Sequence, residues 1–206
     1  MIAIIDYGMG NLRSVEKGFL KVGAEVRVTN KPDDVLNADG VVLPGVGAFR
    51  DCMGELNNLN LVRSVHDTIN AGKPYLGICL GLQVLFSESD EFGNCRGMDI
   101  LKGRVIRFDL ENKELKIPQM GWNQLNIKRN NPLFKNIPDK SYFYFVHSYY
   151  VSPDDSSVIA TTTDYGIEFT SSVWKDNIYA VQFHPEKSQT HGLQLLRNFT
   201  DIVNEK

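Results

Sequence analysis

Residues 73–86 read Lys-Pro-Tyr-Leu-Gly-Ile-Cys-Leu-Gly-Leu-Gln-Val-Leu-Phe. The apolar run 73–78 predicts a strand, and residues 82–86 predict a helix behind it. Between them stands Gly-x-Cys-x-Gly at 77–81, which has the form of a nucleophile elbow. In such an elbow the nucleophile occupies a sharp strand-to-helix turn, and small flanking residues let neighbouring backbone pass close to it. The alternative is a buried structural cysteine beside two turn glycines.

The residues that precede this stretch alternate short β-rich runs with helical periodicity. A helix is expected over 12–22, where the apolar residues share one face, and a second one carries Val62, Val65 and Ile69 and ends at 71–72. Strands are expected at 2–6, 24–28 and 40–43. This alternation predicts a parallel sheet with crossover helices.

The second half of the chain is richer in β-structure. Its β-rich segments are 105–108, 142–151, 158–163 and 178–183. They follow one another with little helix between them, so antiparallel strands are expected to extend the parallel sheet. A final helix carries its inward apolar residues at Leu195, Leu196, Phe199, Ile202 and Val203. We therefore expect an α/β fold with an open, mixed, mostly parallel sheet flanked by helices, and one domain over 1–206.

Charge and composition exclude several classes of function. The 22 Lys and Arg residues and the 25 Asp and Glu residues give a net charge of −3, with no basic block, so nucleic acid is not an expected partner. No apolar run approaches the roughly 18 residues that a membrane span needs, and we expect a cytoplasmic protein with no membrane partner. The three cysteines form no CxxC pair and the four histidines show no metal-ligand spacing, so neither a metal nor a cofactor is expected.

A second motif lies at 180–186, where a predicted strand ends in His184-Pro185-Glu186. Residues two apart on an extended chain project to the same side, and Pro185 pushes His184 toward extended geometry. A histidine that accepts a thiol proton needs its other ring nitrogen held by an acceptor, which Glu186 can provide. The alternative is an exposed turn after an edge strand.

A third feature is the loop Pro44-Gly45-Val46-Gly47 at the end of the third expected strand. It can turn a backbone N–H, for instance that of Val46, toward an oxyanion formed at Cys79. The alternative is a tight strand-to-helix turn. Ligands of open parallel sheets bind beyond the carboxyl ends of the strands, so this loop and the cysteine would face one crevice.

Taken together, Cys79, His184 and Glu186 resemble in their chain order the triad of the class I glutamine amidotransferases. Segment 77–83 is similar to the nucleophile segment of that family and 183–186 to its His-Glu segment, and the resemblance spans almost the whole chain. It implies a flavodoxin-like fold and a glutaminase in which Cys79 attacks the side-chain amide of L-glutamine. Leu82 departs from the methionine that is common in relatives, which puts nothing catalytic in doubt.

The same resemblance implies roles for further residues. The N–H groups of Leu80 and Val46 would form the oxyanion hole. The amino-acid end of glutamine would be held by Gly47, Gln83, Ser148 and Tyr149. For these last four the alternatives are turn, helix-surface and strand-pairing roles.

Three segments narrow the resemblance to one branch of the family, the glutaminase subunits of imidazole glycerol phosphate synthase. They are 118–123, 144–149 and 187–188. The resemblance implies a heterodimer with a (βα)₈ barrel synthase subunit in histidine biosynthesis, which receives the ammonia. The implied interface residues are Asn11, Gln119, Met120, Trp122, Tyr144 and Lys187. Core packing is the alternative for Trp122 and Tyr144.

Other functions remain open at this stage. Related amidotransferase subunits serve surface-sugar amination, anthranilate or aminodeoxychorismate pathways, although 119–123 and 187–188 favour the histidine pathway. A hydrolase of esters or peptides is disfavoured because the usual α/β-hydrolase order places the acid before the histidine. A catalytically silent binding module is disfavoured because all three triad positions are retained.

Overall fold

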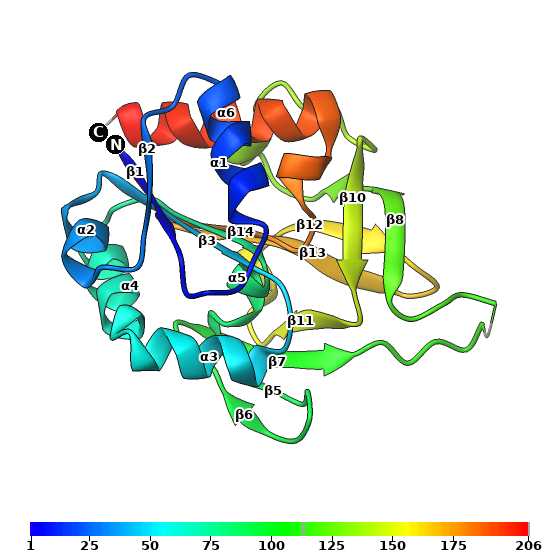
Figure 1. The fold of residues 1–206 in the computed structure, drawn as a ribbon. Coiled ribbons are helices and arrows are strands. Elements are labelled where there is room, and N and C mark those ends of the chain that lie inside the picture. Colours follow the sequence, from blue (N-terminus) through cyan, green and yellow to red (C-terminus); the bar gives the residue numbers. More distant parts are fainter. Residues whose placement is uncertain (113, 206) are drawn as a thin grey trace.

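The computed structural model describes residues 1–112 and 114–205, and its centre is a twisted sheet (Figure 1). Five neighbouring strands are parallel and run in the order β2-β1-β3-β4-β14. They are β1 (Ile2–Ile5), β2 (Val26–Thr29), β3 (Gly40–Gly45), β4 (Tyr75–Cys79) and β14 (Ile178–Val181). The parallel first half expected from the sequence is confirmed.

The sheet continues beyond β14 with strands that are mostly antiparallel, as expected. In sheet order they are β13 (Glu168–Lys175), β11 (Tyr149–Pro153), β7 (Leu101–Arg107), β5 (Phe86–Ser89) and β6 (Cys95–Arg96). Two more strands lie off this path: β12 (Ile159–Asp164) pairs with β13, and β9 (Asn126–Ile127) pairs with β12. Over the described residues the sheet has twelve strands.

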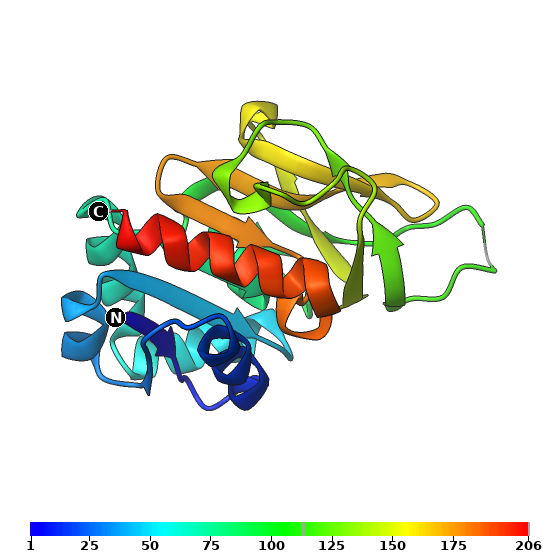
Figure 2. The same ribbon diagram turned by 90° about the horizontal axis from the view of Figure 1, so that it is seen from above.

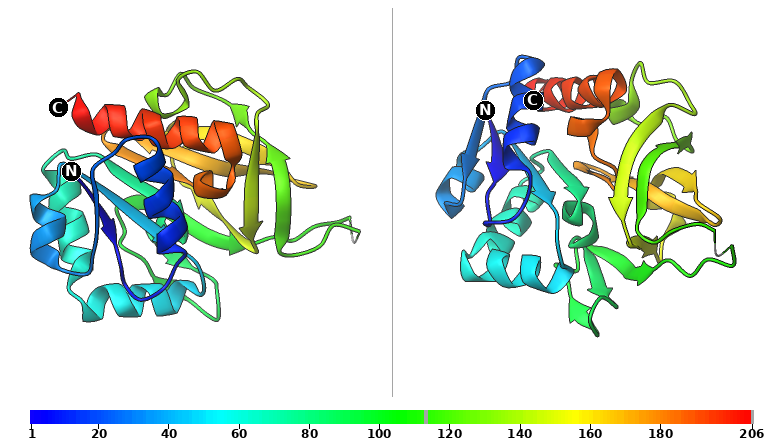
Figure 3. Two further views of the ribbon diagram at one scale, coloured as in Figure 1. Left: turned by 45° about the horizontal axis from the view of Figure 1, so that its top comes forward. Right: turned by 45° about the vertical axis from the view of Figure 1, so that its right-hand side comes forward.

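Helices cover both faces of the parallel half (Figures 1 and 3). One face carries α1 (Leu12–Lys21) and α6 (Gln189–Asn204), and the other carries α2 (Pro32–Asn37), α3 (Phe49–Asn58) and α4 (Leu61–Asn70). Successive residues of β1 enter opposite hydrophobic clusters, Ile2 and Ile4 on the α1 side and Ala3 and Ile5 on the other. This two-sided burial explains the uninterrupted apolar sequence of the strand. In the part of the chain that is described, no helix combines the length and apolarity needed to cross a membrane.

The β-rich segment expected at 142–151 forms two strands, not one. It divides at Ser148 into β10 (Tyr142–His147) and β11, which belong to different sheets. Strand β10 pairs with β8 (Gln119–Gln124) in an antiparallel ribbon outside the main sheet. The N-terminal end of α6 points toward this β8–β10 ribbon (Figure 2). Ser148 and Tyr149 therefore lie at a bend between two sheets.

The helix expected at 82–86 is also wrong in its bounds. Helix α5 begins directly after the cysteine and covers only Leu80–Gln83, and Phe86 already begins β5. The carbonyl oxygens of Val84 and Leu85 accept hydrogen bonds from the 98–101 segment. These bonds draw the chain into the sheet after one helical turn.

The turn between β4 and α5 depends on close backbone approaches. Cys79 adopts φ 54°, in the left-handed region that residues with side chains rarely occupy. A Cβ atom on Gly81 would lie 1.8 Å from the carbonyl oxygen of Leu43, and one on Gly77 would lie 2.4 Å from the carbonyl oxygen of Gly81. Gly81 is thus required by the packing of the turn on β3, and Gly77 by the close approach of the turn to β4 itself.

We predict that Gly81→Ala lowers the free energy of unfolding by about 3 kcal/mol or more, because the new methyl group meets backbone that cannot move aside. Gly54→Ala is the matched control. Gly54 is exposed within α3, has no atom near its added Cβ, and is expected to gain up to about 1 kcal/mol. Urea unfolding of both variants measures the difference. Equal stability of the two variants would contradict the packing described here.

Candidate active site

The strand order brings the three sequence motifs together at the carboxyl ends of neighbouring parallel strands. Cys79 ends β4, which lies between β3 and β14. Gly45 pairs with Cys79 across β3 and β4, so the 44–47 loop begins beside the cysteine. On the other side Val181 pairs with Ile78, and the chain then continues to His184. Segments far apart in sequence meet because their strands are neighbours in the sheet.

His184 and Glu186 form a buried pair. The imidazole Nδ1 lies 2.8 Å from the Glu186 Oε1, and the two side chains are 3% and 1% exposed. His184 has extended backbone, and Pro185 opens a single 3₁₀ turn, η3 (Pro185–Lys187), that folds Glu186 back onto the ring. The alternative of an exposed turn after an edge strand is therefore wrong.

Burial by itself lowers the pKa of His184, because a charged ring is poorly solvated in the interior. Electrostatic interaction with Cys79, and then the hydrogen bond and charge of Glu186, outweigh that effect and raise the pKa to about 10. The ring nitrogen Nε2 makes no hydrogen bond to another described residue, so it is left to exchange a proton with the sulfur. The raised pKa keeps the imidazole of His184 protonated at neutral pH.

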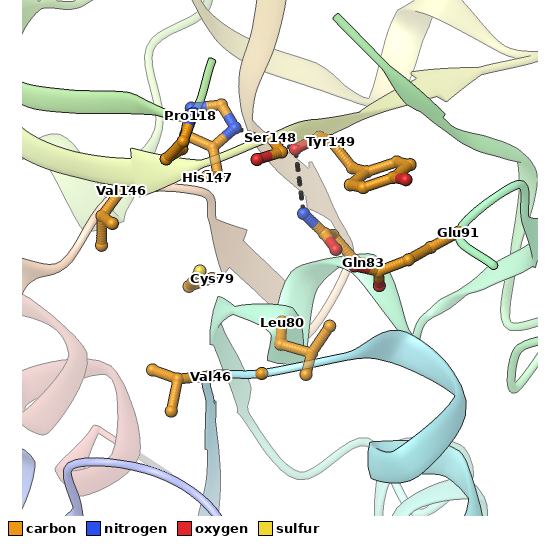
Figure 4. A pocket seen from close by; sticks show the side chains of 11 residues that line it. Val46, Cys79, Leu80, Gln83, Glu91, Pro118, Val146, His147, Ser148 and Tyr149 are labelled. Carbon is orange, nitrogen blue, oxygen red and sulfur yellow. Dashed lines mark hydrogen bonds between the residues drawn. The ribbon is translucent and has the colours of Figure 1, made fainter. Parts of the chain in front are cut away.

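Cys79 opens into a cavity of about 360 Å³. Figure 4 shows the sulfur between Val46 and Leu80 on one side and the 146–149 segment on the other. The lining residues are Val46, Gly47, Cys79, Leu80, Gln83, Glu91, Pro118, Val146, His147, Ser148 and Tyr149. All the residues expected to hold glutamine or its oxyanion are among them.

Gln83 lies inside this site, so the helix-surface alternative for it is wrong. Its amide nitrogen donates to the carbonyl oxygen of Tyr149 and to the Gln182 Oε1, each at 3.0 Å (Figure 4 shows the first bond). Both N–H groups are therefore used within the chain. The amide oxygen of Gln83 is the atom that remains for a bound molecule.

Two residues of the site carry no signal in the sequence. Glu91 follows β5 in a loop, lines the cavity, and accepts a 2.7 Å hydrogen bond from the backbone N–H of Phe49 at the start of α3. Gln182 lies next to the nucleophile, with its Nε2 3.6 Å from the Cys79 sulfur. Neither stands in a pattern that local spacing can identify, because their hydrogen-bond partners are distant in the sequence.

His147 is a second buried histidine at the cavity wall. Burial is the largest effect on its pKa, which is lowered to about 4, so the ring is neutral at pH 7. Its Nδ1 lies 2.8 Å from the Tyr149 carbonyl oxygen, and its Nε2 lies 3.0 Å from the side-chain amide of Gln119. These contacts fix the bend at Ser148 that faces the sulfur.

Three of the six residues expected at a partner interface, Met120, Trp122 and Tyr144, lie on the outer face of the β8–β10 ribbon, and Lys187 lies beside them in η3. Met120 and Trp122 are 65% and 45% exposed, so core packing does not account for Trp122. The Trp122 and Tyr144 rings meet edge to face at 6.1 Å, and the Lys187 ammonium lies 5.7 Å from the Tyr144 ring centre.

Asn11 and Gln119 differ from the others in where they lie. Asn11 is exposed and directly precedes α1. Gln119 is buried, because successive residues of a strand face opposite sides and its neighbour Met120 faces out. The side chain of Gln119 contacts His147 inside the molecule instead of a partner surface, which corrects the expectation for this residue.

Comparison with known proteins relates the whole chain to one family. The family model described as glutamine amidotransferase class-I matches residues 3–203. A protein of Syntrophotalea carbinolica named imidazole glycerol phosphate synthase subunit HisH is 56% identical over 206 residues, covering 98% of this chain and 100% of the relative. The protein of the same name from Geobacter sulfurreducens is 56% identical over 205 residues, covering 98% of both chains.

The fold is shared with solved structures of much lower sequence identity. The glutaminase domain of Trypanosoma brucei CTPS, solved with bound acivicin, superposes with a TM-score of 0.73 at 18% identity. The alignment covers 100% of this chain and 94% of that domain. The open, mixed, mostly parallel sheet expected from the sequence is thus confirmed as the fold of this family.

Proposed function

Because the chain belongs to the class I glutamine amidotransferase family, we propose that it is the glutaminase subunit of an imidazole glycerol phosphate synthase, which supplies ammonia for histidine biosynthesis. It converts L-glutamine and water to glutamate and ammonia. The observation that carries the proposal is the buried His184–Glu186 pair, which lies beside Cys79 at the open end of the parallel sheet.

The first half of the reaction transfers the γ-glutamyl group to sulfur. The Cys79 thiolate attacks the side-chain amide carbon of glutamine, and His184 gives its proton to the nitrogen as the carbon–nitrogen bond breaks. Ammonia leaves and a thioester remains. Glu186 keeps the imidazole oriented through the 2.8 Å contact at Nδ1, so that Nε2 faces the reacting atoms.

The second half returns the enzyme to its starting state. His184 takes a proton from water, which attacks the thioester carbon, and glutamate and the Cys79 thiolate are released. Each tetrahedral intermediate carries a negative oxygen, for which we propose the backbone N–H groups of Leu80 and Val46. The loss of one such donor costs roughly 10²–10³ in rate in well-studied hydrolases.

The cavity also supplies partners for the amino-acid end of glutamine. The free amide oxygen of Gln83 and the carboxylate of Glu91 are acceptors suited to its α-ammonium group. We assign Gly47, Ser148 and Tyr149 to the same end of the substrate, since they line the cavity with Gln83. Glu91 is held by the N–H of Phe49, which keeps its carboxylate in place without a positive side chain.

A (βα)₈ barrel synthase subunit is the proposed partner, in a heterodimer that works in the cytoplasm. The exposed Met120 and Trp122 on the outer face of the β8–β10 ribbon suit the centre of an interface, where aromatic residues and methionine are enriched. Tyr144 and Lys187 extend the same surface, and Asn11 borders it. The inner face of the same ribbon reaches the cavity through His147.

We predict that Cys79→Ala abolishes glutamine-driven formation of imidazole glycerol phosphate when the chain is mixed with a barrel subunit, with a fall of at least about 10³-fold. Synthesis from added ammonium salts is expected to continue at the wild-type rate, because that chemistry belongs to the partner. Product formation from each nitrogen source is the measurement.

Cys95→Ala is the control for this test, since Cys95 is a free cysteine away from the cavity. It should retain both activities. Full glutamine-driven activity of the Cys79→Ala complex would favour a catalytically silent module, and loss of both activities would contradict the division of labour.

We predict that Trp122→Ala raises the dissociation constant of the complex with the barrel subunit at least about tenfold, because a large ring at an interface centre is removed. Phe92→Ala is the matched control, since Phe92 is 73% exposed and lies outside the ribbon. Titration calorimetry measures both constants. Unchanged affinity of the Trp122 variant, or equal loss in the two variants, would show that the ribbon is not the interface.

A further inference from the structure

Gln182 occupies a position next to the nucleophile that the mechanism above does not use. It follows β14 directly and its side chain has no exposed surface. Its backbone N–H bonds to the Ser171 carbonyl oxygen at 2.9 Å, which keeps this segment in the sheet. Because residues two apart on an extended chain project to the same side, Gln182 and His184 both reach Cys79.

Hydrogen bonding fixes which end of the Gln182 amide faces the sulfur. The Tyr149 carbonyl oxygen can only accept, so the Gln83 group that meets it at 3.0 Å is the NH₂. The second N–H of Gln83 then points to Gln182, which must present its oxygen, at 3.0 Å. The remaining end of Gln182 is its NH₂, and that group lies 3.6 Å from the Cys79 sulfur.

We propose that Gln182 is a hydrogen-bond donor to the nucleophile, which holds the Cys79 sulfur in place and stabilises its thiolate. The inference rests on the proposed function and adds a residue to that reaction. A donor that points at an anion favours the charged form. Helix α5 has only four residues, so its dipole offers the sulfur less than a full-length helix would. The buried amide supplies a donor that does not titrate.

The proposal assigns Gln83 a positioning role beside its role in the cavity. Without the bond that Gln83 donates to its amide oxygen, the Gln182 side chain loses the contact that fixes its orientation toward Cys79. The chain of contacts therefore runs from a backbone carbonyl through two side-chain amides to the sulfur. Among the described residues, the titratable groups that surround the sulfur or line its cavity are His184, Glu186, Tyr7, His147, Tyr149 and Glu91.

The test is the pH dependence of Cys79 alkylation by iodoacetamide in the full chain, followed by mass spectrometry of the peptide that contains Cys79. Gln182→Met keeps the side-chain length and removes the donor. We expect the midpoint of alkylation to move about one pH unit higher, and kcat/KM for glutamate release at neutral pH to fall about tenfold. Cys95 in the same sample, and Gln194→Met on α6, should show the wild-type behaviour.

An unchanged midpoint in a folded Gln182→Met variant would overturn the proposal. If that variant does not fold, the isosteric Gln182→Glu takes its place; a carboxylate facing the sulfur should move the midpoint higher still, and an unchanged midpoint would again reject the role. Glutamate release by the wild-type chain in complex with the barrel subunit is measured separately. Its absence would refute the proposed glutaminase, whereas the alkylation profile reports on the Gln182 contact alone.

Discussion

The left-handed backbone of Cys79 is the constraint on which the site depends. A residue with a side chain costs of order 1–3 kcal/mol in such a conformation, and persists there only when its surroundings impose it. Here Gly77 and Gly81 allow backbone contacts that any larger residue would prevent, and the Tyr75 hydroxyl donates to the Gly81 carbonyl oxygen at 2.9 Å. This packing lifts the sulfur out of β4 and into the cavity instead of burying it among the strands.

The neighbours of β4 supply the remaining groups. Strand β3 leads into the 44–47 loop, and β14 leads to both Gln182 and His184. Because both strands pair with β4, these residues are held close to Cys79. Two buried histidines show how surroundings set their charge. Interaction with Cys79 and with the Glu186 carboxylate raises the pKa of His184, whereas burial and, to a smaller extent, the charge of His184 lower the pKa of His147. The His184 ring is suited to proton transfer, and the neutral His147 ring is suited to holding the bend at Ser148.

Sequence patterns predicted what depends on local order: the elbow around Cys79, the His184–Glu186 neighbours, and the strands of the parallel half. The patterns failed where contacts between residues far apart in the sequence determine the local structure. The helix after the cysteine ends early because the carbonyls of Val84 and Leu85, which follow it, bond to the 98–101 segment. Gln119 faces inward because the pairing of β8 with β10 decides which side chains of β8 point into the molecule. Gln182 and Glu91 have hydrogen-bond partners that are distant in the sequence, so no spacing marks them.

The central claim is that Cys79 is the nucleophile and that His184 activates it. The most direct measurement treats the chain with a diazoketone analogue of glutamine and maps the covalent adduct by peptide mass spectrometry, in the wild type and in His184→Ala. The account predicts a single adduct on Cys79 that forms far more slowly in the variant. An adduct on Cys95, no adduct at all, or equal rates in the two proteins would contradict it.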